Sequence, residues 1–165
     1  MLARADWQCG QIRTGWDMSS GRGLKVLLID DSAVVRRIVK RLLKADSRVQ
    51  HLFTAANAAD GYSLFKISRP DAVVLDLKLP DLHGLEILKR IKSSAPRCVV
   101  IILTNCDKPE TREECLRHGA DSFLKKESDL LRVVSAIPTL CQPGRAPARS
   151  GAKNGTADEK KRELR

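Results

Sequence analysis

The chain has few aromatic side chains and no long apolar run. Only 4% of its 165 residues are Phe, Trp or Tyr, so any core must consist mainly of aliphatic side chains. No stretch approaches the roughly 18 consecutive apolar residues of a membrane span. Arg4 and Asp6 leave no room for the apolar segment of a secretory signal at the N-terminus. We therefore expect a cytoplasmic protein of one ordinary domain, without membrane association.

Disulfides and cysteine-based metal sites are also not expected. The five cysteines are odd in number and include no C-x-x-C pair. Cys98 and Cys106 lie in or beside an apolar run, which favours buried or half-buried thiols. A reducing cytosol fits this pattern.

The net charge of +10 is unevenly distributed, and the last 24 residues carry +4 of it. Residues 142–165 are rich in Pro, Gly, Ala and Lys without apolar periodicity, which predicts a disordered basic tail. Residues 1–23 also lack a period and end in a Ser-Gly linker, so a disordered extension is predicted there, with Met18 as an alternative start. Nucleic-acid binding is not expected, because no aromatic interleaving or recognition-helix pair accompanies the basic residues.

Between residues 24 and 141, short apolar runs alternate with helix-like segments five times. Such runs are typical of buried parallel strands, so the chain predicts an α/β, flavodoxin-like fold. We expect a five-stranded parallel sheet with helices on both faces, and the order 2-1-3-4-5 would make strands one and three neighbours. The predicted strands are 26–29, 49–54, 72–76, 98–103 and 122–125, and the predicted helices are 33–44, 57–67, 83–92, 109–118 and 129–140.

The first helix has the clearest pattern. Ser32 is its expected N-cap, and an apolar stripe runs along one face. The opposite face is basic and is interpreted as solvated, as a docking surface for an acidic partner, or as a nucleic-acid patch. Its cations are Arg36, Arg37, Lys40, Arg41 and Lys44.

Chemically active side chains stand where the predicted strands end. Asp30 and Asp31 are followed by Asp76 after 45 residues from Asp31, by Thr104 after another 28, and by Lys126 after another 22. A strand–helix–strand unit takes roughly 25 residues at these element lengths, so the intervals correspond to two, one and one units. Right-handed crossovers place these strand ends at one edge of the sheet, where we expect the side chains to converge.

The chemistry of this set points to a cation and a phosphoryl group. Neighbouring carboxylates repel each other unless a cation compensates them, and oxygen ligands of this kind suit Mg²⁺. Asp76 can then act as a nucleophile toward phosphorus. The Lys126 ammonium and the Thr104 hydroxyl can contact the phosphoryl oxygens. Taken singly, Asp30-Asp31 also fits a turn with a helix cap, and Thr104 fits a strand terminator.

Over about residues 24–141 the chain resembles the receiver (response regulator) domain of bacterial two-component signalling, of the single-domain type similar to the chemotaxis response regulator. The resemblance is carried by the stretches 24–32, 71–85, 101–105 and 119–126, in this order and at these intervals.

The resemblance implies a role for each site residue. Asp76 is the phosphoacceptor, and Mg²⁺ is held by Asp30, Asp31, Asp76 and the backbone carbonyl of Lys78. Thr104 and Lys126 contact the phosphoryl group. Thr104 and Phe123 form the switch that reports it. Gly84 is expected to open the third helix or to relax the loop before it.

The resemblance also implies partners. The phosphoryl group comes from a histidine kinase or a histidine phosphotransfer protein, docked largely on the first helix and the loops of the site. The receiver catalyses only its own phosphorylation and dephosphorylation. Too little patterned sequence follows Leu140 for an output domain. Output to an unknown protein is therefore expected by protein contact in a phosphorelay, with a phosphorylation-dependent homodimer as a further form.

Three residues depart from the family pattern, and one of them is Asn105, which replaces the frequent small residue after the threonine. Glu127 stands where the family usually has proline after the lysine, and a cis bond before a non-proline residue costs about 3–4 kcal/mol. Phe123 lacks the hydroxyl of the common tyrosine, so switching there must act through rotamer and packing. The sequence also leaves two rival functions open. One is a phosphorylation-independent pseudo-receiver; the other is a Mg²⁺-dependent phosphohydrolase, disfavoured because no D-x-D pair contains the nucleophile.

Overall fold

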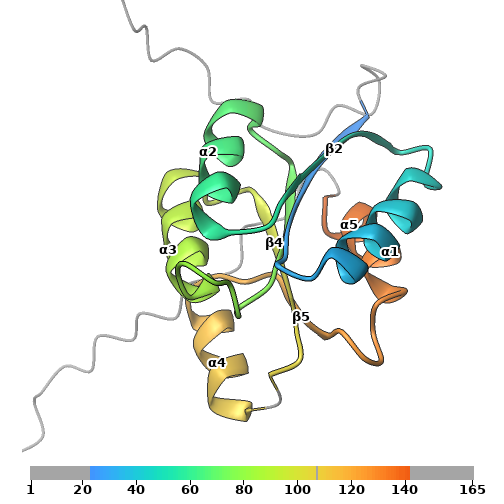
Figure 1. The fold of residues 1–165 in the computed structure, drawn as a ribbon. Coiled ribbons are helices and arrows are strands. Elements are labelled where there is room, and N and C mark those ends of the chain that lie inside the picture. Colours follow the sequence, from blue (N-terminus) through green and yellow to red (C-terminus); the bar gives the residue numbers. More distant parts are fainter. Residues whose placement is uncertain (1–22, 107, 142–165) are drawn as a thin grey trace, which may run out of the picture.

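The computed structural model describes residues 23–106 and 108–141. Five strands alternate with five helices, as the apolar pattern predicts (Figure 1). The strands are β1 (Leu24–Ile29), β2 (Val49–Ala55), β3 (Ala72–Leu75), β4 (Val99–Thr104) and β5 (Ser122–Lys125). The helices are α1 (Ala33–Lys44), α2 (Ala58–Ser68), α3 (Gly84–Ser94), α4 (Pro109–Arg117) and α5 (Arg132–Leu140).

The strands form one parallel sheet in the order β2-β1-β3-β4-β5, which confirms the predicted flavodoxin-like topology. The register pairs Ile29 of β1 with Leu75 of β3, and Leu75 with Ile102 of β4. Because strands β1 and β3 are neighbours and end level with each other, the residues that follow them emerge side by side. The chain reverses its direction of winding at this point, which is where sheets of this type hold their ligands.

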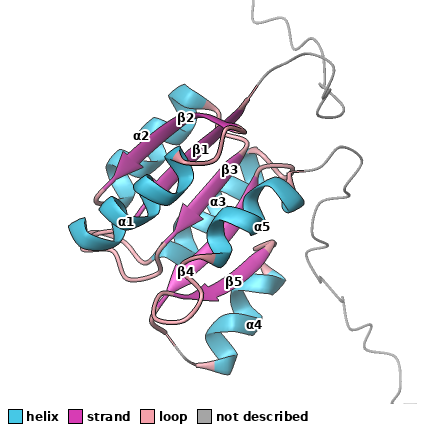
Figure 2. Ribbon diagram, turned by 90° about the vertical axis from the view of Figure 1, so that its right-hand side faces the viewer, coloured by secondary structure: helices cyan, strands magenta, loops and turns pink. Residues whose placement is uncertain are grey.

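Helices cover both faces of the sheet. Helices α1 and α5 lie on one face and α2, α3 and α4 on the other (Figures 1 and 2). Within β1, Val26 and Leu28 pack toward α1 and α5, whereas Leu27 and Ile29 pack toward α2 and α3. All four side chains have no exposed surface. This double burial explains why the strands read as continuous apolar runs rather than as alternating ones.

Side-chain caps begin three of the helices, α1, α2 and α3. Ser32 Oγ accepts from the Val35 amide at 3.4 Å, as predicted. Asn57 begins α2, and Asp81 of the β3–α3 loop adds a second cap that the sequence did not indicate. The Asp81 carboxylate accepts from the amides of Ala58 and Ala59 at 2.8 and 2.9 Å, and these hydrogen bonds lower its pKa. The loop after β3 is thereby tied to α2.

The last helix was predicted too long. It begins at Arg132, not at Asp129, because the Asp129 carboxylate and amide both bond back to the backbone of Lys125. This local turn competes with the helix for the same backbone groups. No peptide bond in the described residues is cis, so the bond between Lys126 and Glu127 is trans.

The predicted thiols agree with the structure. Cys98, Cys115 and Cys141 are buried and Cys106 is half-buried; Cys98, Cys106 and Cys115 are free thiols. Burial raises the pKa of Cys98 to about 12. The predicted tail 142–165, and the predicted extension 1–23 apart from Gly23, lie outside the described residues. Among the described helices, none has the length and apolar character needed to cross a membrane.

Candidate functional site

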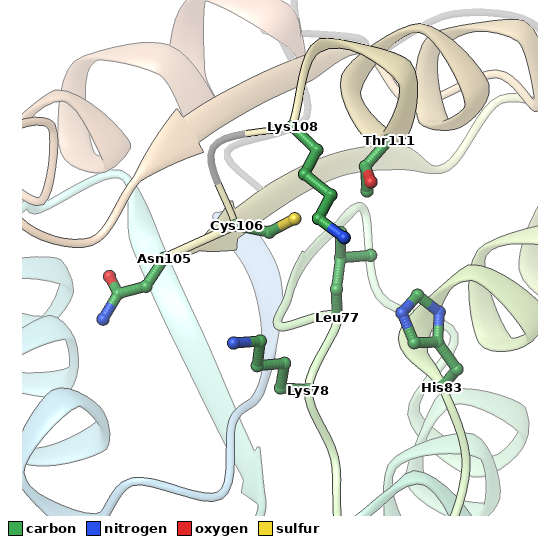
Figure 3. Close-up of a pocket in the computed structure, with 7 residues that line it drawn as sticks. All are labelled: Leu77, Lys78, His83, Asn105, Cys106, Lys108 and Thr111. Carbon is green, nitrogen blue, oxygen red and sulfur yellow. The ribbon is translucent and has the colours of Figure 1, made fainter.

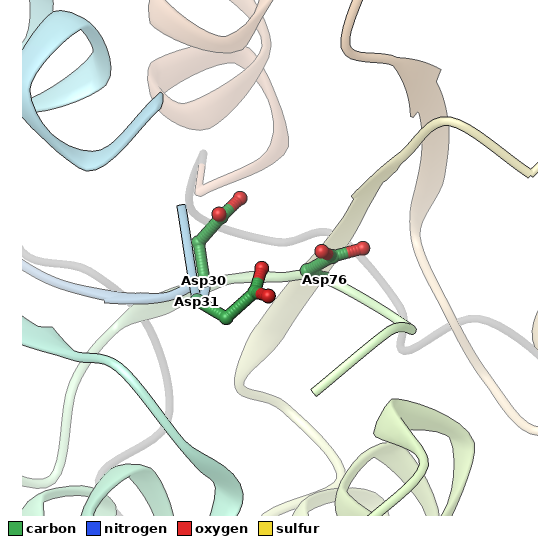
Figure 4. Close-up of side chains that lie close together, drawn as sticks. All are labelled: Asp30, Asp31 and Asp76. Carbon is green, nitrogen blue, oxygen red and sulfur yellow. The ribbon is translucent and has the colours of Figure 1, made fainter. Parts of the chain in front are cut away.

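Three carboxylates meet at the carboxyl ends of β1 and β3. Asp30, Asp31 and Asp76 each offer one oxygen, and these oxygens lie within 4.8 Å of one another (Figure 4). Asp30 and Asp76 are 1% and 3% exposed, whereas Asp31 is exposed. The backbone fixes their starting points, since the Asp76 amide donates to the Ile29 carbonyl at 2.9 Å. The predicted convergence of the acid pair with Asp76 is present in the fold.

Lys126 bridges two of these carboxylates. Its Nζ lies 2.6 Å from Asp76 Oδ2 and 2.8 Å from Asp30 Oδ2. Its amide donates to the Thr104 carbonyl at 3.1 Å, which anchors the β5–α5 loop to the end of β4. Burial opposes the charge on Lys126, but the two carboxylates outweigh it, so the pKa of Lys126 is raised. The ammonium stays charged at neutral pH.

Asp30 is the most strained charge in the site. Burial raises its pKa, and the Asp76 charge adds to this rise; Lys126 and the Ser32 amide only partly oppose it. Oδ1 accepts from the Ser32 amide at 2.9 Å. Oδ2 is close to the Lys126 ammonium, yet the angles complete no hydrogen bond. The contact is an ion pair, and a lone pair of Oδ2 is still available.

The pocket fits a divalent cation. Three carboxylates against one ammonium leave an excess of two negative charges, and a buried carboxylate oxygen retains an unused acceptor position. Oxygen donors of this type suit Mg²⁺, which binds through one or two carboxylates and phosphate oxygens. Asp30, Asp31 and Asp76 are the residues that would hold it.

Thr104 ends β4 as predicted, whereas Phe123 lies within β5, and their surroundings differ. Thr104 is fully buried, and its hydroxyl accepts from the Cys106 amide at 3.4 Å. Phe123 is 7% exposed and packs into the core that α4 covers. The Arg112 guanidinium lies 5.5 Å from the Phe123 ring centroid and donates to the Phe123 carbonyl at 3.2 Å. Helix α4 is therefore coupled to the aromatic residue of β5.

The backbone around Asp76 is held from two sides. The Lys78 amide donates to Asp76 Oδ1 at 3.2 Å, while the Lys78 side chain is exposed. Gly84, the first residue of α3, donates to the Leu77 carbonyl at 2.9 Å. A Cβ at Gly84 would lie only 2.8 Å from Leu77 Cα and 3.0 Å from the Asp76 carbonyl carbon. Gly84 thus opens the helix as expected, and it also allows the helix to touch the loop that carries Asp76.

An open pocket of about 500 Å³ lies beside the acid cluster, between the loops after β3 and β4 (Figure 3). Hydrogen bonds from the Lys108 amide and the Thr111 hydroxyl lower the pKa of Cys106 at its rim. Among the described lining residues, Lys78 and Lys108 bring positive charge next to the acids. The pocket is lined by Leu77, Lys78, His83, Asn105, Cys106, Lys108 and Thr111.

The sequence groups Arg36 with the basic face of the first helix, but its side chain bonds to the loop before that helix. Its Nη1 donates to the carbonyls of Asp30 and Asp31, at 2.6 and 2.9 Å. The sequence signal for this contact is the position of Arg36 in the first turn of the helix that follows the acid pair. The apolar periodicity of the helix does not reveal it, because the arginine leans back along the helix toward the loop.

The family profile of the response regulator receiver domain matches residues 26–138. The chain belongs to the response regulator receiver family. Phosphorylation and Mg²⁺ binding at an acidic pocket are characteristic of this family in two-component systems.

Among the relatives of this receiver is a protein-glutamate methylesterase/protein-glutamine glutaminase from Halalkalibacterium halodurans. It is 34% identical over 106 residues, which is 64% of this chain and 31% of the relative. The DNA-binding transcriptional activator DevR/DosR from Mycobacterium tuberculosis is 32% identical over 114 residues, which is 69% of this chain and 52% of the relative. The chain thus spans about a third to a half of the length of these relatives.

Solved structures have the same fold. A LuxR-family two-component response regulator from Aurantimonas superposes with a TM-score of 0.67 at 28% identity, covering 73% of this chain and 86% of that one. A CheY-like receiver domain protein from Methanospirillum hungatei gives 0.68 at 22% identity, covering 73% of this chain and 94% of that one. At the lower identity the likeness shows the fold alone.

Proposed function

We propose that this receiver accepts a phosphoryl group on Asp76 from the phosphohistidine of a histidine kinase or histidine phosphotransfer protein. The observation that carries the proposal is the Lys126 ammonium, which bridges Asp76 and Asp30 at 2.6 and 2.8 Å in a pocket of three acids. The Asp76 carboxylate follows the end of β3, where parallel sheets hold their ligands, and it contacts the buried Lys126 ammonium. It is therefore suited to attack phosphorus.

In the transfer, a carboxylate oxygen of Asp76 forms a bond to phosphorus while the bond from phosphorus to the imidazole nitrogen breaks. The electron pair of the broken bond stays with the imidazole. Lys126 is positioned to leave its ion pair with Asp76 and to contact a phosphoryl oxygen, and the Thr104 hydroxyl is the candidate donor to another. The Lys78 amide, which donates to Asp76 Oδ1, orients the carboxylate.

Bound Mg²⁺ would neutralise the phosphoryl oxygens and the acid pair. Asp30, Asp31 and Asp76 are the proposed side-chain ligands, with the Lys78 carbonyl as a backbone ligand. The unused acceptor position on buried Asp30 Oδ2 supports this assignment.

Signalling is proposed to pass from Thr104 and Phe123 to a partner protein in a phosphorelay. The contact of Arg112 with Phe123 supports a route from β5 to the surface of α4. The added charge would shift an existing two-state equilibrium of this face. A homodimer that forms on phosphorylation is one form of such a contact. The methylesterase and DNA-binding activities in the names of the relatives belong to those proteins.

The test is phosphorylation of the purified chain by acetyl phosphate with Mg²⁺, followed by intact-mass measurement. We expect one phosphoryl group on the native chain and none on Asp76→Asn. Asp60→Asn, an exposed change in α2, should be labelled like the native chain. An unlabelled native chain would instead favour a phosphorylation-independent binding module. Transfer from candidate histidine kinases, compared in rate, would then identify the donor, and light scattering with and without label would test the homodimer.

A further inference from the structure

Arg36 holds the loop that presents the acid pair. Its Nη1 lies 2.6 Å from the Asp30 carbonyl oxygen and 2.9 Å from the Asp31 carbonyl oxygen. Its own amide donates to the Ser32 carbonyl at 2.9 Å, as the first hydrogen bond of α1. The side chain and the backbone of one residue therefore bind three consecutive carbonyls of the β1–α1 loop.

These two side-chain bonds determine the backbone of Asp31. The Asp30 carbonyl belongs to the rigid peptide plane before Asp31 Cα, and the Asp31 carbonyl belongs to the plane after it. Because φ and ψ of Asp31 are the only soft rotations between these planes, fixing both carbonyls fixes the direction of its Cα–Cβ bond. The Asp31 side chain is exposed, so packing does not supply this constraint.

Asp30 is constrained by other contacts as well. Its amide donates to the Ala55 carbonyl at 3.1 Å, and its carboxylate accepts from the Ser32 amide. The loop thus has a firm start at Asp30 and a firm end at the N-terminus of α1. Between these two points, the Arg36 side chain supplies hydrogen bonds to both peptide planes of Asp31, the exposed residue of the acid pair.

Arg36 differs from the other cations of its helix. It is half-buried, whereas Arg37, Lys40, Arg41 and Lys44 are exposed. Helix α1 contains no acidic residue with which Arg36 could pair. A guanidinium nitrogen carries two N–H groups in a fixed plane, which suits two neighbouring carbonyls better than a freely rotating ammonium does.

We propose that Arg36 is a positioning residue that aims the carboxylates of Asp30 and Asp31 for Mg²⁺. This inference rests on the proposed function, because it assigns a supporting residue to the metal pocket of that function. The direction in which the Mg²⁺ affinity changes when Arg36 is replaced distinguishes positioning from a simple charge effect. A positive charge near the pocket by itself opposes cation binding, so loss of the charge would tighten Mg²⁺ binding. Loss of the positioning bonds would weaken it.

The experiment measures the Mg²⁺ dissociation constant of the unphosphorylated full chain by isothermal titration calorimetry. Arg36→Met keeps the length of the stem and removes the donors. We expect the dissociation constant to rise about 10-fold, the lower end of the range for partners outside the metal ligands. Arg37→Met removes a neighbouring charge with no bond to the loop and should leave binding unchanged or slightly tighter. Arg36→Lys should be intermediate.

A second readout does not involve the metal. In the metal-free chain, the backbone amide resonances of Asp31 and Ser32 should shift in Arg36→Met and stay in place in Arg37→Met. Mg²⁺ binding by Arg36→Met that is as tight as, or tighter than, that of the native chain would overturn the inference. If Arg36→Met does not fold, native affinity in Arg36→Lys with unshifted amides would do the same. A native chain that binds no Mg²⁺ would reject the metal-dependent function itself, whereas native binding with unchanged variants rejects only the role of Arg36.

Discussion

At the scale of single residues, the site is a compromise between charges. The Lys126 ammonium forms ion pairs with both Asp30 and Asp76. Asp30 bears the cost, since burial raises its pKa and its Oδ2 lacks a directed hydrogen bond. A buried charge of this kind destabilises the metal-free fold and is relieved by a bound cation. The Asp30 charge therefore favours Mg²⁺ binding but lowers the stability of the metal-free fold.

Asp30→Asn should remove this opposition. The folded-state pKa of Asp30 is raised above its ordinary value of 3.8, so the folded chain binds the proton more readily than the unfolded chain. In the native chain, this contribution to the free energy of unfolding is present at low pH and is lost as pH rises through the raised pKa. The free energy of unfolding of Asp30→Asn should not show this decrease with rising pH. Thermal unfolding between pH 4 and 7, with a chelator present, measures it.

Mg²⁺ should reverse the order of stability at neutral pH. At about 100 times its dissociation constant, a ligand stabilises the folded state by about 2.7 kcal/mol. The native chain should show this gain, and Asp30→Asn should lose most of it. Glu113→Gln, an exposed change in α4, is the control and should behave as the native chain does. An Asp30→Asn chain that keeps the full Mg²⁺ response would contradict the assignment of Asp30.

At the scale of elements, the helix after the acceptor strand is built against the acceptor loop. Helix α3 begins at Gly84, whose backbone lies on the backbone of Asp76 and Leu77. Neither of these backbone segments can move aside as a flexible side chain could. The position of Asp76 is therefore coupled to the packing of the whole helix.

Gly84→Ala should damage both stability and the site. The added methyl group meets backbone atoms, and overpacking of this kind costs about 2 kcal/mol. Urea unfolding should show this loss, and labelling by acetyl phosphate should slow in the same variant. Ser93→Ala, exposed on the same helix, should change stability by no more than about 0.5 kcal/mol. Native labelling by Gly84→Ala would show that the loop adapts without moving Asp76.

At the scale of the whole molecule, the carboxyl ends of the strands carry the site, and the amino ends carry contacts that stabilise the fold. The carboxyl edge carries the acids and Lys126. The amino edge carries a buried ion pair, in which Lys92 Nζ lies 2.7 Å from Asp121 Oδ2 and 2.7 Å from the Cys98 carbonyl oxygen. The same Asp121 oxygen accepts from the Val100 amide at 2.9 Å. This ion pair joins α3 to the starts of β4 and β5, far from the chemistry.

Lys92→Met should therefore lower stability without changing the site. The Asp121 side chain is 5% exposed and would lose this ammonium, which costs about 3 kcal/mol for a pair of this type. The Mg²⁺ dissociation constant should stay native. Lys89→Met breaks the exposed pair with Glu86 on the same helix and should cost no more than about 0.5 kcal/mol. A weakened Mg²⁺ affinity in Lys92→Met would show that the two edges are coupled.

Much of this architecture follows from local pattern. Apolar runs and helical stripes locate all five strands and all five helices, because burial on both faces of a parallel sheet imposes those patterns directly. The intervals between Asp31, Asp76, Thr104 and Lys126 predict their shared edge, because each crossover has nearly constant length and hand. Boundaries were less certain, as the late start of α5 shows, since a turn at Asp129 competes with helix formation there.

The contacts that tune the site depend on the assembled fold. One ammonium is shared by Asp30 and Asp76, and Gly84 lies on the backbone of the acceptor loop. The Arg36 side chain turns back to two carbonyls. These contacts depend on how segments far apart in sequence come together or on which rotamer a side chain adopts. Periodicity reports which way a residue faces relative to water. It carries no information on which of several polar neighbours a long side chain reaches, because that choice is made only when the loops have closed.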